Sequence, residues 1–498
     1  MILGVSLDDI KSPLPARRIL LKDESGDAEE QLTTTQQPVI VKQPIATAPI
    51  PKERKNKKTL IFIILGVVLV LLIILFLSAS KKNIVTGKVT LTYWGLWEDE
   101  SVMNGIIADF ESKNPNIKIN YKKKTKEGYR GLLAGRLAKS GSGVEVPDIF
   151  RIHNTYIPMF RDYLASVPTK VATNIGLDTD FFDVYKTDLK ENGVWLSIPL
   201  MYDGLVMFCN SELLNKAGLE VPKDWWSLKK AAIKITEKEE DGKIKVAGAA
   251  LGSVDNVDHW SDIVGLMTKQ NGVNFKSIET AESTAKLKDV FNFYTLFKTS
   301  DKVWDDTLPN STQFFASGNL GFYFGPSWRI FDIQTLNPGL KFEIASMPQL
   351  PITTTSKEGI DTGSELTNIY WASYWTEGVN NKSRYQEQAW KFLEYLSSVE
   401  GLEKMYEAAS QTRSFGQIYP RKSMVDKISS NSKLKPFVDS ANNASSWYLA
   451  SNTSDDGLNT QMQKYFSDAI NNNKGIDGAM TTLVSGIVQL RQKYGLMR

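Results

Sequence analysis

The chain has 498 residues, 42% of them hydrophobic, which is enough for buried cores. Its formal net charge of +3 at pH 7 leaves no electrostatic footprint for nucleic acid. The single cysteine, Cys209, excludes an intrachain disulfide and is expected in the core, within an apolar stretch. The 2 histidines, His153 and His259, form no HExxH zinc motif and leave few candidates for a Ser–His–Asp triad.

Residues 1–58 open the chain and are predicted to be a disordered cytoplasmic tail with a basic flank. Proline, threonine and glutamine are frequent over 31–52, and aromatic residues are rare. Such a segment buries too little apolar surface to offset the entropy of ordering. A solvated tail is therefore favoured over a segment that binds a partner.

An uninterrupted apolar run over 60–77 contains no charge and no proline. A helix of this length, at about 1.5 Å per residue, matches the hydrocarbon core of a bilayer, so we predict a transmembrane signal-anchor helix over 59–80. Lysine and arginine are more frequent before the run than after it, which predicts a cytoplasmic N-terminus and an extracellular C-terminal part. The alternative is a cleaved signal peptide, for which the small residues at 78–80 offer a cleavage site.

Strands and helices alternate in the region that follows residue 84. Alternating apolar residues predict strands over 88–94, 117–121 and 147–150, and helical spacing predicts helices over 101–111 and 129–138. This alternation is typical of an α/β protein with a parallel sheet. Helices then dominate and are predicted over 226–239, 280–297, 383–396, 399–409 and most of 458–498. Residues 348–358 are predicted to be a linker or an exposed loop.

Six segments in a fixed order carry a resemblance to a known family. They are LTYWGLWE at 91–98, PDIF at 147–150, PLMYDGLVMFCN at 199–210, AGL at 217–219 with Pro222 and a tryptophan after it, FASG at 315–318 with GPSW at 325–328, and AWKFL at 389–393. In this order they resemble extracellular solute-binding proteins of family 1, the maltose-binding-like substrate-binding proteins of sugar ABC transporters. The sequence departs from the family at Cys209, where a tyrosine is usual.

The resemblance implies an α/β fold of the two-lobed periplasmic-binding-protein-like type (type II), with a central cleft, in addition to the N-terminal transmembrane helix. We assign 84–200 and 345–398 to the first lobe, and 201–344 and 399–498 to the second lobe. Ligand is expected to bind in the cleft and to be buried by hinge closure.

A sugar presents apolar C–H faces and a rim of hydroxyl groups, so its site needs flat aromatic side chains together with carboxylates or amides. Such groups follow the predicted strand ends. The candidate ligand-binding residues are Trp97, Glu98, Asp99, His153, Asn154, Tyr156, Tyr202, Asp203, Trp260, Trp328, Trp371, Trp375 and Arg413. The resemblance aligns Asp203 with the family's acidic sugar contact and Trp328 with a stacking position. The competing interpretation of Asp203 is a hinge carboxylate that caps local N–H groups.

The predicted function is that of a membrane-anchored extracellular substrate-binding component of an ABC importer, which binds a sugar or oligosaccharide without turnover. Its expected partners are the sugar, the permease subunits of the transporter and the membrane, through helix 60–77. It is expected to be a monomer with no enzymatic activity, cofactor or metal. Two alternatives remain: a membrane-anchored glycan hydrolase that pairs Asp99 with Asp203, and a surface adhesin or sensor without a transporter.

Overall fold

The computed structural model describes residues 87–355, 361–472 and 475–496. The predicted tail and the predicted membrane helix over 60–77 lie outside these residues. Among the described residues, no helix is long and apolar enough to cross a bilayer. The membrane anchor therefore stays a prediction. The described residues all belong to one compact unit, Val85–Arg498.

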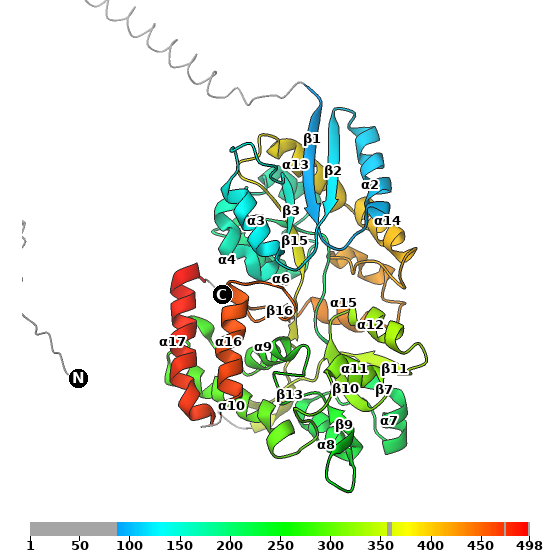
Figure 1. The fold of residues 1–498 in the computed structure, drawn as a ribbon, viewed down its shortest axis with the longest axis vertical. Helices are drawn as coiled ribbons and strands as arrows, with labels where there is room; N and C mark the ends of the chain where they lie inside the picture. Colours follow the sequence, from blue (N-terminus) through cyan, green and yellow to red (C-terminus); the bar gives the residue numbers. More distant parts are fainter. Residues whose placement is uncertain (1–86, 356–360, 473–474, 497–498) are drawn as a thin grey trace, which may run out of the picture. The chain divides into compact units, whose positions relative to one another are not determined.

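The first lobe is built around a five-stranded sheet with the order β2-β1-β3-β15-β6 (Figure 1). Its strands are β1 (Val89–Gly95), β2 (Ile117–Lys123), β3 (Ile149–His153), β6 (Ile198–Pro199) and β15 (Trp375–Val379). β1 runs parallel to β2 and β3, whereas β15 is antiparallel to β3 and β6. A segment from late in the chain, β15, therefore joins this sheet, as the resemblance implied.

Helices cover this sheet and bury the alternate apolar residues of its strands. They are α2 (Glu100–Lys113), α3 (Tyr129–Ala138), α4 (Ile157–Phe160), α5 (Thr169–Ile175), α6 (Asp183–Leu189), α13 (Gln386–Leu396) and α14 (Val399–Ser410). A small hairpin, β4 (Lys190–Glu191) and β5 (Val194–Trp195), follows α6. On β1, Leu91 and Tyr93 are fully buried.

Helix α14 belongs with the first lobe, which corrects the assignment of 399–498 to the second. The Lys404 ammonium lies 2.6 Å from the Asp109 carboxylate of α2, and Lys113 lies 2.9 Å from Glu400. The chain turns back at Ser398, whose side chain caps α14 by accepting from the amide of Gly401. This turn lays α14 along α2.

The second lobe contains a sheet with the order β11-β7-β10-β9-β8. Its strands are β7 (Val206–Asn210), β8 (Glu237–Lys238), β9 (Ile244–Ala249), β10 (Leu320–Gly325) and β11 (Phe342–Ala345). Around it lie α7 (Ser211–Ala217), α8 (Trp225–Ile235), α9 (Trp260–Gln270), α10 (Ala281–Thr299), α11 (Ser311–Ala316), α12 (Arg329–Leu336), α16 (Leu458–Ile470) and α17 (Ile476–Tyr494). Cys209 is fully buried in β7, which confirms its predicted core position.

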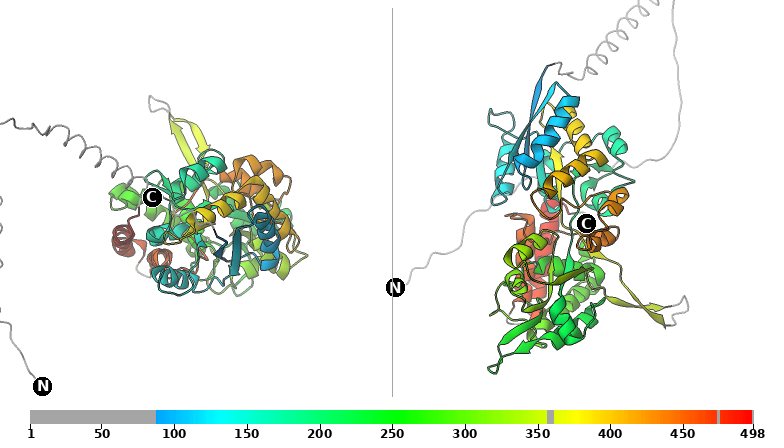
Figure 2. Two further views of the ribbon diagram at one scale, coloured as in Figure 1. Left: turned by 90° about the horizontal axis from the view of Figure 1, so that it is seen from above. Right: turned by 90° about the vertical axis from the view of Figure 1, so that its right-hand side faces the viewer.

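Residues 345–371 also stay with the second lobe, which corrects their assignment to the first. The amide of Trp225 in α8 donates to the Gln349 carbonyl over 3.2 Å, and the Gln270 side chain donates to the Pro348 carbonyl over 3.0 Å. The predicted loop at 348–358 contains instead the start of a hairpin, β12 (Pro351–Thr355) and β13 (Asp361–Leu366). This hairpin projects from the lobe (Figure 2).

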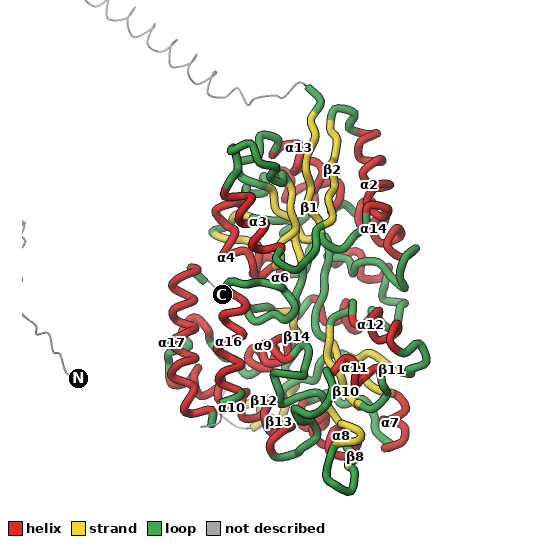
Figure 3. Tube along the Cα trace, in the orientation of Figure 1, coloured by secondary structure: helices red, strands yellow, loops and turns green. Residues whose placement is uncertain are grey.

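The links between the two sheets lie side by side (Figure 3). β14 (Tyr370–Trp371) pairs with β16 (Ala444–Ser445), which follows α15 (Lys435–Ala441). The amide of Leu205 donates to the Trp371 carbonyl over 3.0 Å, and the amide of Ser373 donates to the Asp203 carbonyl over 3.1 Å. The link from β6 to β7 is therefore paired with the link from β14 to β15, and the two lobes meet at this pairing.

Candidate ligand-binding site

A cavity of about 240 Å³ lies where the linking segments meet. Its lining comes from the loop after β1, the end of β3, the paired links, the start of α9, the turn before α12, and residues 413–417 and 451–452. Both lobes therefore contribute side chains, which is the arrangement expected of a ligand site at a hinge.

Aromatic rings form one wall of the cavity. The ring of Trp375 lies edge-to-face against Trp97, with 5.4 Å between the ring centroids, and against His153, with 5.1 Å between them. Behind them, Tyr156 contacts Trp375 at 5.7 Å. Edge-to-face packing of this kind fixes each ring in place, so the exposed part of Trp97 is a preorganised apolar surface.

Trp371 is buried beneath the cavity and is held from two sides. Its indole N–H donates to the Asp262 carboxylate over 2.8 Å. A Cβ atom placed on Gly265 of α9 would lie 2.5 Å from its ring, so only glycine lets the indole approach the helix this closely. Trp371 is thereby fixed in position.

Trp328 is the most exposed of the lining tryptophans, with 36% of its surface accessible. The Arg329 guanidinium lies 4.3 Å from its ring centroid, and His259 contacts it edge-to-face at 5.7 Å. An exposed ring supported in this way suits a stacking contact with the apolar face of a sugar.

Asp203, in the link between β6 and β7, supplies a carboxyl group to the lining of the cavity. Its Oδ1 accepts from the amides of Gly204 at 2.8 Å and Ser327 at 3.0 Å, and its Oδ2 accepts from the Ser327 hydroxyl at 2.9 Å. Desolvation by the surrounding protein raises the pKa of Asp203 to about 7, although these hydrogen bonds act in the opposite direction. Three donors hold the carboxyl group, and it keeps further acceptor capacity toward the cavity.

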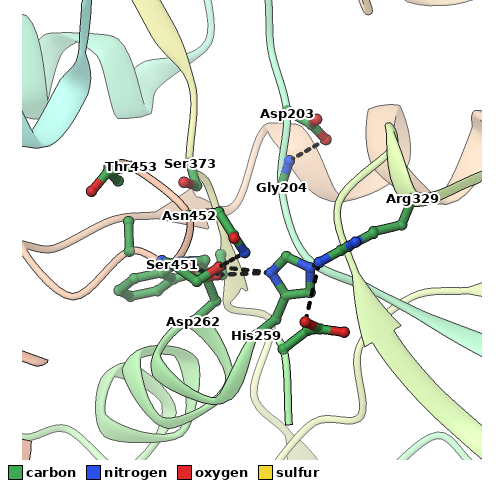
Figure 4. A network of polar contacts seen from close by, with 12 residues as sticks. Asp203, Gly204, His259, Asp262, Arg329, Ser373, Ser451, Asn452 and Thr453 are labelled. Carbon is green, nitrogen blue, oxygen red and sulfur yellow. Dashed lines mark hydrogen bonds and ion pairs between the residues drawn. The ribbon is translucent and has the colours of Figure 1, made fainter. Parts of the chain in front are cut away.

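A polar chain connects α9, α12 and the loop after β16 (Figure 4). Arg329 Nε donates to His259 Nε2 over 3.0 Å, and a guanidinium can only donate, so the imidazole proton must lie on Nδ1. His259 Nδ1 then donates to the Ser451 hydroxyl over 2.7 Å, and that hydroxyl donates to Asp262. Burial lowers the pKa of His259, which keeps the ring neutral and the chain intact at pH 7.

The loop that carries Ser451 is held in an unusual backbone conformation. Asn452 and Ser454 have positive φ angles of 54° and 52°. The Tyr156 hydroxyl donates to the Thr453 carbonyl over 2.6 Å, and Arg130 of α3 forms an ion pair with Asp456. The loop thus contacts the first lobe through α3 and Tyr156, while Ser451 binds Asp262 of the second lobe.

Several of the residues predicted from the sequence meet at this cavity. Trp97, His153, Asp203, Trp328, Trp371, Trp375 and Arg413 line it. They come from segments far apart in the chain, and all except Arg413, which follows α14, lie at the end of a strand or in a segment that joins strands. Their placement agrees with the geometry of a binding site, and their contact with ligand stays a prediction.

The remaining candidates, Glu98, Asp99, Asn154, Tyr156, Tyr202 and Trp260, do not line the cavity. Glu98 is buried in an ion pair with Arg151, whose nitrogen lies 2.6 Å away. Asp99 is exposed and lies 2.5 Å from Lys123. Asp99 is paired with Lys123 and does not line the cavity, so it does not form with Asp203 the pair of carboxylates that a hydrolase needs.

The other residues of this set support the site from behind. Asn154 donates to the Asp188 carboxylate over 2.8 Å. Tyr156 backs the aromatic wall, Tyr202 packs against Phe182 with 5.2 Å between the ring centroids, and Trp260 is buried at the start of α9. Each of these side chains is directed into the protein by the packing of its own element.

Sequence reasoning missed several lining residues, among them His259, Asp262, Ser327, Ser451 and Asn452. The spacing of His259 and Asp262, three apart at the start of a helix, places them on one face and could have indicated the pair. The two loop residues carry no local signal, because their place depends on the positive φ angles of the turn.

Comparison with known proteins agrees with this geometry. The model of the family described as bacterial extracellular solute-binding protein matches residues 105–436. A multiple sugar-binding protein of Streptococcus mutans is 24% identical over 330 residues, which cover 64% of this chain and 74% of that protein. The similarity therefore extends over most of both chains.

Solved structures share the fold. The sugar-binding protein MalE from Xanthomonas citri matches with a TM-score of 0.61 and 18% identity, over 81% of this chain and 98% of that one. The cyclic alpha-maltosyl-1,6-maltose binding protein from Arthrobacter globiformis matches with a TM-score of 0.62 and 16% identity, over 82% of this chain and 100% of that one. These relatives bind solutes and are not enzymes, and the chain belongs to the bacterial extracellular solute-binding protein family.

Proposed function

We propose that the protein is the substrate-binding component of an ABC importer, and that it binds a sugar or oligosaccharide between its two lobes. The observation that carries the proposal is the cavity at the links, which combines fixed aromatic rings with a carboxyl group held by three donors. The names of the relatives support it, because one is a multiple sugar-binding protein and a similar structure has mannotriose bound.

Each part of the cavity has a role in this proposal. Trp97 and Trp328 stack on the apolar faces of the sugar rings, Trp375 holds Trp97 in place, and Asp203 accepts hydrogen bonds from hydroxyl groups. The paired links allow the lobes to open and close around the ligand, which exchanges solvent contacts for these protein contacts. The proposal involves no bond breaking in the sugar: of the two described carboxylates that line the cavity, Asp262 is engaged by the Trp371 indole and the Ser451 hydroxyl.

The setting of the protein is part of the same proposal. Helix 60–77 would anchor the chain in the membrane, and the two-lobed part would lie on the extracellular side, next to the permease subunits of the importer. The apolar run and the excess of basic residues before it support this arrangement. The protein would act as a monomer, because one chain supplies both walls of the cavity.

A thermal-shift screen of the full chain, purified in mild detergent, tests the proposal against a panel of mono- and oligosaccharides. A true ligand raises the melting temperature by mass action, and the rise grows with ligand concentration. Analysis of each mixture for shorter sugars tests for turnover in the same samples. A panel in which no saccharide raises the melting temperature, or in which products accumulate, would overturn the proposal.

Two substitutions locate the site. Asp203→Ala and Trp328→Ala should each weaken binding by about 1–3 kcal/mol, because one removes a hydrogen-bonding carboxylate and the other a stacking surface. Trp226→Ala is the matched control, since Trp226 is also an exposed tryptophan of the second lobe, 49% accessible, and lies outside the cavity. Equal affinities in wild type and both site variants would reject the assigned site.

A further inference from the structure

The charged side chains that line the cavity differ in how many hydrogen-bond or ion-pair partners the protein supplies to them. The lining contains two carboxylates, Asp203 and Asp262, and two cationic side chains, Lys126 and Arg413. Asp262 accepts from the Trp371 indole, from the Ser451 amide over 3.2 Å and from the Ser451 hydroxyl. Its negative charge is therefore compensated by protein donors and is not available to a cation of the ligand.

Arg413 differs from Asp262, because the described protein groups do not compensate its charge. Its side chain is half-buried and lies at the cavity, with the guanidinium 5.4 Å from the ring centroid of Phe331. In the part of the chain that the structure describes, it forms no ion pair, and its buried Nε has no hydrogen-bond partner. A desolvated guanidinium without an anion is costly, so the free donors of Arg413 are an open binding position.

Among the described residues, the acidic group that acts on Arg413 is already engaged. Glu98 is the carboxylate whose charge acts most on Arg413, and it lies 2.6 Å from the Arg151 guanidinium. The Gln417 side chain donates to the second Glu98 oxygen over 3.3 Å. No acidic side chain among the described residues pairs with Arg413, which leaves the position in front of it open to a ligand.

The platform beneath Arg413 is rigid. Phe331 of α12 packs against Phe415 with 4.5 Å between the ring centroids, and both rings line the cavity. A guanidinium held on an aromatic face keeps its donor edge free for a planar or bidentate anion. Lys126 lies on the same cavity, and its ammonium donates only to the Asn452 carbonyl, over 3.4 Å, so it adds a second positive charge.

We propose that the saccharide taken by this site carries an anionic group, a carboxylate or a sulfate, and that Arg413 binds this group. The inference rests on the proposed function and narrows its substrate class. Asp203 and the tryptophans then bind the sugar ring, while Arg413 and Lys126 select the charge. A neutral sugar would leave the Arg413 donors in contact with water or with nothing.

The test compares matched sugars on the full chain in mild detergent. Titrations followed by tryptophan fluorescence or calorimetry use neutral, carboxylated and sulfated mono- to trisaccharides, such as glucose against glucuronate and N-acetylglucosamine against its 6-sulfate. We expect one anionic arm to bind about tenfold or more tightly than its neutral partner at low salt. This advantage should shrink as ionic strength rises, and the two anionic arms distinguish a carboxylate from a sulfate.

Substitution of Arg413 then assigns the selectivity. Arg413→Gln should reduce the anionic-to-neutral affinity ratio about tenfold, leaving only the smaller contribution of the Lys126 charge, and Arg413→Lys should keep more of the ratio, because the charge remains but the bidentate geometry is lost. Lys433→Gln is the matched control, since Lys433 also lies over a phenylalanine ring, at 5.2 Å from Phe342, but outside the cavity. The ratio is measured within each variant, so a general loss of affinity cancels.

The outcomes separate the two proposals. Neutral sugars that bind as tightly as their anionic partners, or an anionic preference that is as large in Arg413→Gln as in wild type, would overturn this inference while the sugar-binding function stands. A protein that binds no saccharide in any arm would overturn the proposed function and this inference together.

Discussion

Gly265→Ala should destabilise the protein, although the same substitution inside a helix normally stabilises it. A Cβ atom on Gly265 would lie 2.5 Å from Cη2 and 2.7 Å from Cζ2 of Trp371. Carbon atoms in good contact are ~3.5–4.0 Å apart, so the indole has to move by about 1 Å. Its hydrogen bond to Asp262 resists this movement.

The magnitude follows from two opposing terms. Forcing an extra methyl group into a packed site costs about 1–3 kcal/mol. The better helix propensity of alanine returns about 0.5–1 kcal/mol. The net loss of unfolding free energy should therefore be about 0.5–2 kcal/mol. Ligand affinity should also fall, because a displaced Trp371 narrows the cavity that it lines.

Gly105→Ala provides the control for this measurement. Gly105 is exposed in the middle of α2, and a Cβ atom there would meet nothing within 4 Å, so alanine should stabilise by about 0.5–1 kcal/mol. Urea unfolding of the full chain in detergent, followed by fluorescence, gives both values. If Gly265→Ala stabilises as much as Gly105→Ala, Trp371 is not packed against α9 and the described floor of the cavity is wrong.

Three further substitutions test other parts of the structure. Burial lowers the pKa of His259 below its usual value of about 6.5, so the unfolded chain binds a proton more readily than the folded protein and stability is lost as pH falls below about 6.5; the free energy of unfolding measured with urea should therefore decrease from pH 7 to 5, and His259→Gln should flatten this dependence. Asp203 has the opposite linkage, because its raised pKa of about 7 makes ionisation unfavourable in the folded protein; Asp203→Asn should gain melting temperature over wild type at pH 8 compared with pH 4, and a constant difference would contradict the shift. Arg151→Met should cost about 3–5 kcal/mol in unfolding experiments, because it leaves Glu377 buried without its partner at 2.6 Å; addition of Glu377→Gln should recover part of the loss.

Local pattern predicted the elements of the first lobe well. The helix predicted over 129–138 has the bounds of α3, and the strand predicted over 88–94 differs from β1 by one residue at each end. These elements depend on periodicity within the segment, which the sequence shows directly. The hairpin at 351–366 was not predicted, because its glycine, proline, serine and threonine residues are typical of turns. Strand β12 forms because it pairs with β13, which local pattern does not show.

The periodicity of a segment could not predict which of the two lobes that segment packs against. The apolar stripe of α14 shows that one face is buried, but a stripe does not identify the neighbour that covers it. The ion pairs Lys113–Glu400 and Lys404–Asp109, one helical turn apart, show that α2 is that neighbour. Such pairings join residues nearly 300 positions apart, and nothing in either segment alone indicates them.

Some residues of the cavity are placed by local sequence pattern, and others are placed by contacts between distant segments. Trp97, Asp203 and Trp328 follow strands or links directly, so strand order alone brings them to one place. Ser451 reaches the cavity only because the backbone after it turns through positive φ angles, which the Tyr156 hydroxyl and Arg130 fix from the first lobe. The hydroxyl that completes the chain from Arg329 to Asp262 therefore depends on contacts made by the other lobe. Separating the lobes would remove the first-lobe contacts of this loop, while His259 Nδ1 would still lie 3.5 Å from the Asp262 carboxylate, so only the link through Ser451 depends on contact between the lobes.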